Sequence, residues 1–372
     1  MISEYYTNNR FRTYHGFTVF AIDGTSLQLP NSEEITDKYG FATNNKKDHK
    51  GMPMSRASHV YDVLNGITIS AYIEPYNTPE RNIYFKHIKD IGDFKQKNTI
   101  EKILVILDRG YPSLGVILAA ISLGIDVLAR CRSDFLKKTM AGMVRNNQKD
   151  IVFKCSDLWP KLNAKQKREL KRNGLDFKLL ENKSLRILVI ELSTGEKEFL
   201  ITTLVDQEIY KYDYFAELYF SRWGIEENYK FIKIRVEMEN WSGLTIHAIS
   251  QDFYATIFST NAHQLLLNQA QVEIEEEKSI IYNRRIIKTI AEVRKKQTKK
   301  YGYKINRNVS MGTFKDKIIY ALLDPRVDLG IICEQVISQS KKSLIPIRPG
   351  RKNARIVKIT NRKFHMNQRR CL

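Results

Sequence analysis

The stretch that most restricts the fold is ILVILD at residues 103–108, an unbroken apolar run that closes on an aspartate. A run without alternating polar positions predicts a strand buried on both faces, as in a parallel sheet covered by helices. Gly110, Pro112 and Ser113 then turn the chain into a predicted helix, LGVILAAISLG, which is followed by the strand pattern IDVLARC. Strand, helix and strand in this order predict an α/β core in which at least part of the sheet is parallel.

Further strand patterns precede this unit. FTVFAID at 17–23 predicts a buried strand that ends on its aspartate, and Thr25–Leu29 predicts a second strand after Gly24. ITISAYIEP at 67–75 predicts a third strand, which its proline ends. These strands enlarge the predicted sheet.

The middle of the chain changes character and becomes polar and rich in lysine. Within it, LRILVIEL and EFLITTL are separated by Ser-Thr-Gly-Glu at 193–196, which predicts a β-hairpin. We therefore expect a β-rich insertion at 132–210 between two parts of one core, 1–131 and 211–277. A basic C-terminal region is expected at 278–372.

Charge limits the possible partners. The 372 residues include 61 Lys and Arg against 41 Asp and Glu, and the net charge of +20 favours a polyanion, with nucleic acid as the first candidate. Residues 341–372 hold eleven Lys and Arg and no acid, so we expect this tail to bind a phosphate backbone. No apolar stretch approaches the roughly 20 residues of a membrane span, and the first residues lack the apolar run of a signal peptide. We expect a cytoplasmic, nucleoid-associated protein with no membrane partner.

Cysteine and histidine offer no metal-binding pattern. The four cysteines lie far apart with no C-x-x-C pair, and the seven histidines show no ligand spacing. This usage fits a reducing compartment and argues against a disulfide framework and a structural zinc site. Any metal ion would have to be held by oxygen ligands.

Two aspartates lie at positions where they could supply such oxygen ligands to a metal ion. Asp23 and Asp108 each close a predicted buried strand. The carboxyl ends of strands are where open α/β sheets place their ligands. Either aspartate alone also fits a strand-end residue that caps a turn.

A third acidic position, Glu226, lies in a segment with helical periodicity. At about 100° per residue, one arc of about 80° carries five polar side chains, those of Tyr219, Arg222, Glu226, Lys230 and Lys233. A carboxylate beside cations on one face suits a site for phosphates and metal ions. The same spacing also fits a solvated face with ion pairs one helical turn apart.

Together these positions resemble the motifs of the insertion-sequence-four family of bacterial transposases. The family's Y-R-E-K signature is matched in full by Tyr219, Arg222, Glu226 and Lys233. Ala21 to Thr25 and Leu107 to Tyr111 resemble its two aspartate motifs, and the segment from Ile347 to His365 resembles its basic tails. The resemblance extends from about Arg10 to the last residue.

The resemblance implies a ribonuclease-H-like core, a mixed sheet with helices, interrupted by a β-rich insertion and followed by a basic helical C-terminal region. It implies a DDE transposase, an endonuclease that also joins strands and moves an insertion sequence by cut-and-paste transposition. DNA would be the partner, both as element ends and as target. The chain would act as a homodimer in the transposition complex.

The resemblance also implies roles for single residues. Asp23, Asp108 and Glu226 would be catalytic and hold two Mg²⁺ ions, for which Mn²⁺ can substitute, with Asp23 between the two. The DNA-binding residues would be Tyr219, Arg222, Lys230 and Lys233. In relatives whose excision passes through a DNA hairpin, a tryptophan of the insertion stacks on a flipped base. Phe199 stands approximately at that place and is a candidate for base stacking or an ordinary strand residue.

Two alternatives stay open. A ribonuclease-H-like nuclease that cuts without strand transfer would share these carboxylates, and a truncated, non-catalytic DNA-binding inhibitor of transposition would need none of them. Family members usually carry a DNA-binding region before the first catalytic strand, whereas about sixteen residues precede it here. We expect a truncated copy or a start further upstream, and in either case no reader of the terminal repeats in that segment.

Overall fold

The computed structural model describes residues 1–7, 11–42, 51–132, 136–157, single positions between 164 and 178, 182–191, 195–289 and 302–347. Within the long helix that ends at residue 289, side chains are described only as far as residue 277. The chain forms two compact units, of which one spans Met1–Ile257 and the other begins at Phe258. The first unit carries every catalytic residue predicted above.

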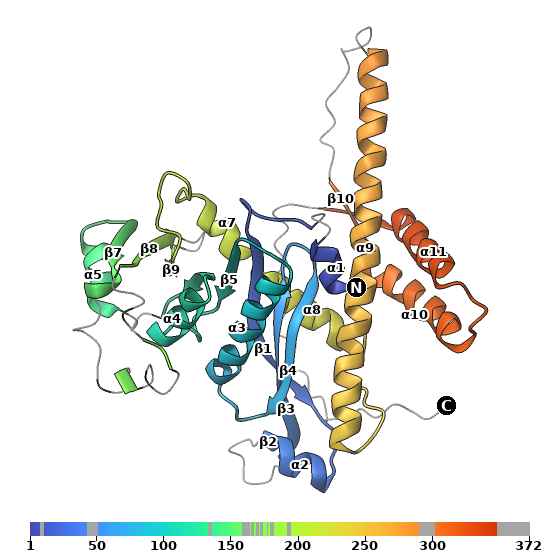
Figure 1. Ribbon diagram of the computed structural model, residues 1–372, viewed down its shortest axis with the longest axis horizontal. Coiled ribbons are helices and arrows are strands. Elements are labelled where there is room, and N and C mark those ends of the chain that lie inside the picture. Colours follow the sequence, from blue (N-terminus) through green and yellow to red (C-terminus); the bar gives the residue numbers. More distant parts are fainter. Residues whose placement is uncertain are drawn as a thin grey trace. The chain divides into compact units, whose positions relative to one another are not determined.

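One mixed sheet of nine strands forms the first unit (Figure 1). The strands are β1 Thr18–Gln28, β2 Phe41–Ala42, β3 Met52–Asp62, β4 Ile67–Pro75, β5 Ile103–Leu107, β6 Asp126–Arg130, β7 Asp150–Lys154, β8 Ser184–Glu191 and β9 Lys197–Thr202. Their order is β2-β3-β1-β5-β6-β9-β8-β7, and β4 also pairs with β3. β1 runs parallel to β5, and β5 to β6, whereas the other pairs are antiparallel. The predicted α/β core with a partly parallel sheet is confirmed.

Helices cover both faces of this sheet. They are α1 Ile2–Thr7, α2 Glu33–Tyr39, α3 Glu80–Lys97, α4 Leu114–Ser122, α5 Lys137–Arg145, α7 Tyr214–Phe220, α8 Trp223–Ile234 and the first part of α9 Ile246–Thr289. On β3, Ser58 is hydrogen-bonded to His87 of α3, and the next residue, His59, packs on the ring of Tyr229 of α8. Because successive side chains of a strand point to opposite faces, α3 and α8 lie on opposite faces of the sheet.

The first strand corrects one prediction. β1 runs without a break through Gly24 because β3 pairs with it on both sides of that residue. Asp23 therefore lies within a strand, opposite His59, and does not end one. The sequence pattern does not predict β3, since Ser55, Arg56 and Ser58 interrupt its apolar residues.

The predicted hairpin is confirmed by the antiparallel pairing of β8 with β9, although Ser193 and Thr194 of its turn lie outside the described residues. β9 also pairs with β6, so these strands extend the core sheet. The expected boundaries of the insertion, 132–210, remain a prediction.

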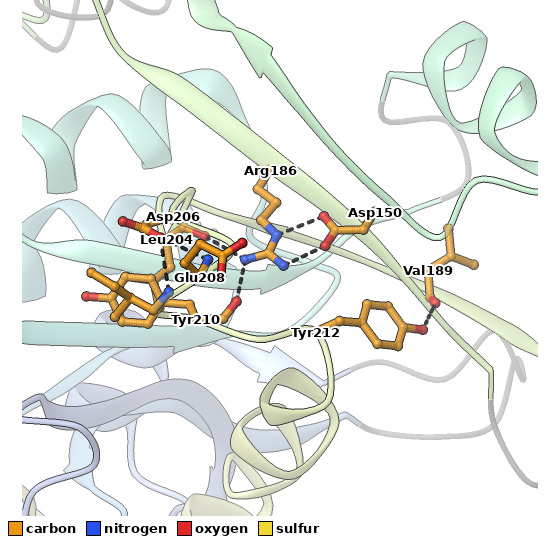
Figure 2. Close-up of polar contacts among 9 residues, drawn as sticks. Asp150, Arg186, Val189, Leu204, Asp206, Glu208, Tyr210 and Tyr212 are labelled. Carbon is orange, nitrogen blue, oxygen red and sulfur yellow. Dashed lines mark hydrogen bonds and ion pairs between the residues drawn. The ribbon is translucent and has the colours of Figure 1, made fainter.

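Arg186 on β8 connects this extension to the segment before α7 (Figure 2). Its guanidinium donates to both carboxylate oxygens of Asp150 and to the carbonyl of Tyr210, the latter at 2.6 Å. Nearby, the Tyr212 hydroxyl donates to the carbonyl of Val189. These bonds fix the start of the segment that carries α7 and α8.

The predicted helix around Glu226 is interrupted. α7 ends at Phe220 and α8 begins at Trp223. Between them the Arg222 N–H donates to the Tyr219 carbonyl, three residues back, which is a tighter turn than an α-helix makes. The chain direction is kept, because the linking residues retain right-handed helical backbone angles.

The second unit contains the rest of α9, β10 Tyr303–Ile305, α10 Arg307–Leu323, α11 Leu329–Lys342 and β11 Leu344–Pro346. Leu267, Ala270 and Ile274 of α9 form an apolar cluster with Ile305. Of the basic tail, 348–372 lies outside the described residues. None of the helices in the part of the chain that the structure describes is long and apolar enough to cross a membrane.

Candidate active site

Two neighbouring parallel strands bring the predicted aspartates together. Ile22 of β1 pairs with Leu107 of β5, so Asp23 and Asp108 are the next residues along two adjacent strands. Both side chains are partly buried. Asp108 follows the carboxyl end of β5, as the sequence pattern predicts, whereas Asp23 lies inside β1, which continues to Gln28.

Helix α8 adds the third carboxylate through Arg222. The guanidinium Nη2 lies 2.7 Å from Glu226 Oε1, and Nη1 lies 3.6 Å from Asp23 Oδ2. Arg222 is only 5% exposed and lies over the rings of Tyr219 and Trp223. One buried cation therefore connects the acid of the helix with the acid of the strand.

The other members of the predicted helical face differ in position. The Tyr219 hydroxyl lies 3.5 Å from Asp108 Oδ1, a long contact, and burial raises the pKa of Tyr219. Lys230 is exposed and pairs with Glu227. Lys233 donates to a backbone carbonyl of β1, so neither lysine contacts the three carboxylates.

Electrostatically, Asp23 is short of positive charge. Burial raises its pKa to about 6, and the N–H of Gly24 and the charge of Arg222 offset only part of this effect. The neighbouring carboxylates of Glu80 and Asp108 raise its pKa further. A cation next to Asp23 would stabilise the charged carboxylate and lower the pKa of Asp23.

Asp23 is also fixed through its backbone, by residues that the sequence analysis does not single out. The Tyr229 hydroxyl donates to the Asp23 carbonyl at 2.7 Å, and the Ser58 hydroxyl does so at 3.2 Å. Tyr229 is three residues beyond Glu226 and follows the helical period, which is the signal that could have indicated it.

A pocket of about 640 Å³ opens beside Asp108. It lies where β5 and β6 end and β9 begins, and half of its lining residues are basic: Arg109, Gly110, Arg130, Cys131, Arg132, Lys197, Glu198 and Phe199. Its one acid, Glu198, is paired with Arg130 at 2.9 Å. The pocket places Phe199 among cations, and Arg109 and Arg132, each two residues beyond the end of a strand, are the signal in the sequence that could have predicted it.

The donor chemistry of the site fits divalent cations such as Mg²⁺ and Mn²⁺, which prefer carboxylate oxygens. Within the described residues, however, no three His, Cys, Asp or Glu side chains stand close enough together to hold an ion. The Arg222 guanidinium lies between two of the carboxylates, those of Asp23 and Glu226.

The sequence model of the family described as "Transposase DDE domain" matches residues 14–262. The match covers most of the first unit, including both strands with the aspartates and the helix with Glu226. The chain belongs to this family of DDE transposase proteins.

The chain is also similar to individual transposases. It is 28% identical over 80 residues to "Putative transposase InsZ" of Escherichia coli (strain K12), a match that covers 22% of this chain and 27% of InsZ. The structure is similar to a piggyBac transposase synaptic complex with hairpin DNA, with a TM-score of 0.42, 8% identity, and coverage of 89% of this chain and 59% of that one. It is also similar to the Mos1 transposase paired-end complex, with a TM-score of 0.23, 12% identity, and coverage of 39% and 50%. The chain spans less than two thirds of each relative, and at these TM-scores neither structural likeness establishes a shared fold.

Proposed function

We propose that this chain cleaves DNA and transfers the cut strand, as the catalytic part of a cut-and-paste transposase with a ribonuclease-H-like core. The observation that carries the proposal is the convergence of Asp23, Asp108 and Glu226 from two adjacent strands and one helix. The antiparallel β1, β3 and β4 followed by the parallel β5 and β6 support the proposed core.

Each acid has a task that its position supports. Asp23, fixed through its backbone and with its pKa raised by burial, would hold divalent cations. Asp108 and Glu226 would supply the further carboxylate ligands of these cations. Divalent cations, once bound, activate a water or a DNA 3′-hydroxyl and offset charge on the leaving oxygen. Arg222, released from the acids, then offers a planar fork to a phosphate next to the cut.

DNA is the proposed partner, as element ends and as target, with a homodimer as the form that holds two ends. The pocket beside Asp108 supports this proposal because Arg109 and Lys197 have no partner among the described residues and are available for phosphates. Phe199 in the same pocket offers a ring on which a base can stack. Tyr219 and Lys230 extend the proposed contact along the site, and the basic tail adds phosphate contacts of no sequence preference.

The test is metal-dependent cleavage of duplexes taken from the DNA on either side of the gene. Asp23→Asn, Asp108→Asn and Glu226→Gln should each lower Mg²⁺-dependent cleavage by about 1,000-fold or more, since no other group replaces a lost ligand. Glu227→Gln is the matched control, because this neighbouring glutamate is exposed and pairs with Lys230. Cleavage by any of the three variants at the rate of Glu227→Gln would refute the site.

Product analysis distinguishes the alternatives. Joined products from labelled ends and a target plasmid indicate strand transfer, whereas cut ends alone indicate a nuclease. A folded protein that binds DNA and gives neither product would be a non-catalytic binder.

A further inference from the structure

A chain of hydrogen bonds leads from Asp90 of α3 to the backbone of Asp23. The Ser58 hydroxyl of β3 lies 3.2 Å from the carbonyl of Asp23 and 3.0 Å from Nε2 of His87, a fully buried residue of α3. On the other side of the ring, Nδ1 of His87 lies 2.8 Å from the hydroxyl of Ser70 on β4. Ser70 in turn donates to the carboxylate of Asp90, three residues further along α3. Four polar contacts thus connect Asp90 with Asp23.

These four contacts share only three protons. Burial lowers the pKa of His87 to about 3, so its ring is neutral and carries a single N–H. Ser58 and Ser70 carry one hydroxyl proton each, whereas the two ends of the chain, a backbone carbonyl and a carboxylate, only accept. The positions of the protons therefore depend on which end is the stronger acceptor.

The Asp90 end is the stronger acceptor. A carboxylate attracts a donor more strongly than a neutral carbonyl does, and the contact between Ser70 and Asp90 is the shortest of the chain. With the Ser70 proton engaged there, Nδ1 of His87 carries the N–H of the ring and donates to Ser70, so Nε2 accepts. The one proton of Ser58 is then shared between Nε2 and the carbonyl of Asp23.

The carbonyl of Asp23 is linked to the carboxylate of the same residue through one peptide. This carbonyl and the N–H of Gly24 belong to the same peptide, and the N–H donates to the Asp23 carboxylate at 2.9 Å. Tyr229 of α8 also donates to the carbonyl, from the face of the sheet opposite to Ser58. A change in the hydrogen bonding of the carbonyl therefore reaches the carboxylate directly.

We propose that Asp90 and His87 are positioning residues of the active site. Through the two serines they set the hydrogen bonding of the Asp23 peptide, and thereby the orientation of the Asp23 carboxylate. The inference rests on the proposed function, in which this carboxylate holds divalent cations. Asp90 itself does not touch the reacting atoms, because three side chains separate it from Asp23.

The test observes the Asp23 peptide by nuclear magnetic resonance of the full chain. Asp23 is the only aspartate of the sequence that is followed by glycine. A protein labelled with ¹³C at the aspartate carbonyl and with ¹⁵N at glycine therefore gives one carbonyl–nitrogen cross-peak. In Asp90→Ala, Ser70 is free to donate to Nδ1, so Nε2 takes the N–H and the Ser58 proton goes entirely to Asp23. The carbonyl ¹³C resonance should move downfield, because hydrogen bonding deshields a carbonyl carbon.

Three further variants give this shift its meaning. Ser58→Ala removes the donor and should move the resonance upfield. Ser70→Ala interrupts the chain beside Asp90 and should move it downfield, so the test does not depend on the folding of one variant. Asp93→Ala, at an exposed aspartate of the same helix, is the matched control and should leave it in place. An unmoved resonance in Asp90→Ala and Ser70→Ala, or a shift in the direction of Ser58→Ala, would overturn the proposal.

Cleavage kinetics then separate a positioning role from a structural one. Asp90→Ala should lower kcat of Mg²⁺-dependent DNA cleavage about tenfold, a usual loss at a residue that orients a metal ligand. It should leave KM for DNA unchanged. Equal kcat values for Asp90→Ala and Asp93→Ala would overturn the positioning role and leave the three-acid site standing. If the wild type cleaves no DNA while the resonance moves as expected, the proposed function fails and the hydrogen-bond chain to Asp23 stands.

Discussion

Two arginines among the described residues of the first unit are almost fully buried, and they differ in how completely their hydrogen-bonding groups are satisfied. Arg186 is 1% exposed, and its guanidinium makes a two-point pair with Asp150 and bonds to backbone carbonyls, as Figure 2 shows. Arg222 is 5% exposed, but its Nε has no partner among the described residues and its contact with Asp23 is long, at 3.6 Å. Only its bond to Glu226 is short.

The difference indicates two kinds of buried charge. A buried cation is tolerated when every one of its N–H donors has an acceptor, and an ion pair of this kind acts in holding the fold together. A buried donor without a partner costs free energy, and such a group is retained where a ligand completes it. Arg186 is therefore a structural residue, whereas the unsatisfied Arg222 fits the phosphate contact that we propose for it.

The largest expected effect is on stability, from Arg186→Met. The substitution leaves the Asp150 carboxylate and the Tyr210 carbonyl without their donor, which should lower the free energy of unfolding by about 3–5 kcal/mol. Urea unfolding followed by circular dichroism measures this loss. Arg145→Met, at an exposed arginine of α5, is the control and should change stability by less than about 0.5 kcal/mol.

The second effect is on catalysis, from Arg222→Met. Removing a preorganised donor next to the reacting phosphate should slow DNA cleavage about 100-fold. The loss of stability should be less than half of that for Arg186→Met, because fewer bonds are broken. Cleavage per folded molecule, measured beside urea unfolding, gives both values for both variants.

Arg235→Met, at the exposed end of α8, is the control for Arg222 and should keep both properties. The comparison would fail if Arg186→Met slowed cleavage per folded molecule as much as Arg222→Met does. It would also fail if Arg222→Met were the less stable protein.

The sequence predicts the parts of this site that depend on neighbours along the chain. The apolar run before Asp108 is enough to predict β5, and the spacing of Arg222 and Glu226 is enough to place them together on one side of a helix. The periodicity of apolar residues does not predict the interruption between α7 and α8, because a single tighter turn changes the hydrogen bonding without changing which residues are apolar.

What the sequence does not predict depends on contacts between distant segments. β3 has a broken apolar pattern and is a strand because it pairs with β1 and β4 on its two sides. Glu80 meets Gly24 and Gly110 only after α3 has packed on the sheet. The unpaired Nε of Arg222 likewise depends on how distant segments pack around it, and the local sequence pattern does not predict that packing.

The smallest effects apply the same comparison to the two lysines of α8. Lys233 is 25% exposed, donates to the Ser26 carbonyl and lies 3.9 Å from Glu239, and burial lowers its pKa. Lys230 is 59% exposed and pairs only with Glu227 among the described residues. Lys233 therefore resembles the satisfied Arg186, whereas Lys230 is exposed and fits the DNA contact that we propose for it.

Lys233→Met should lower the free energy of unfolding by about 1 kcal/mol, the usual contribution of one such hydrogen bond. It should leave the salt dependence of DNA binding unchanged.

Lys230→Met should keep stability within about 0.5 kcal/mol, because an exposed ion pair contributes little. It should reduce the slope of log affinity against log salt by about 0.9, the value for one lost phosphate contact. Binding to a fixed duplex at four or more salt concentrations, together with urea unfolding, tests both variants. If Lys233→Met reduces the slope as much as Lys230→Met does, Lys233 contacts DNA as the Y-R-E-K resemblance implies, and it must leave the Ser26 carbonyl when DNA binds.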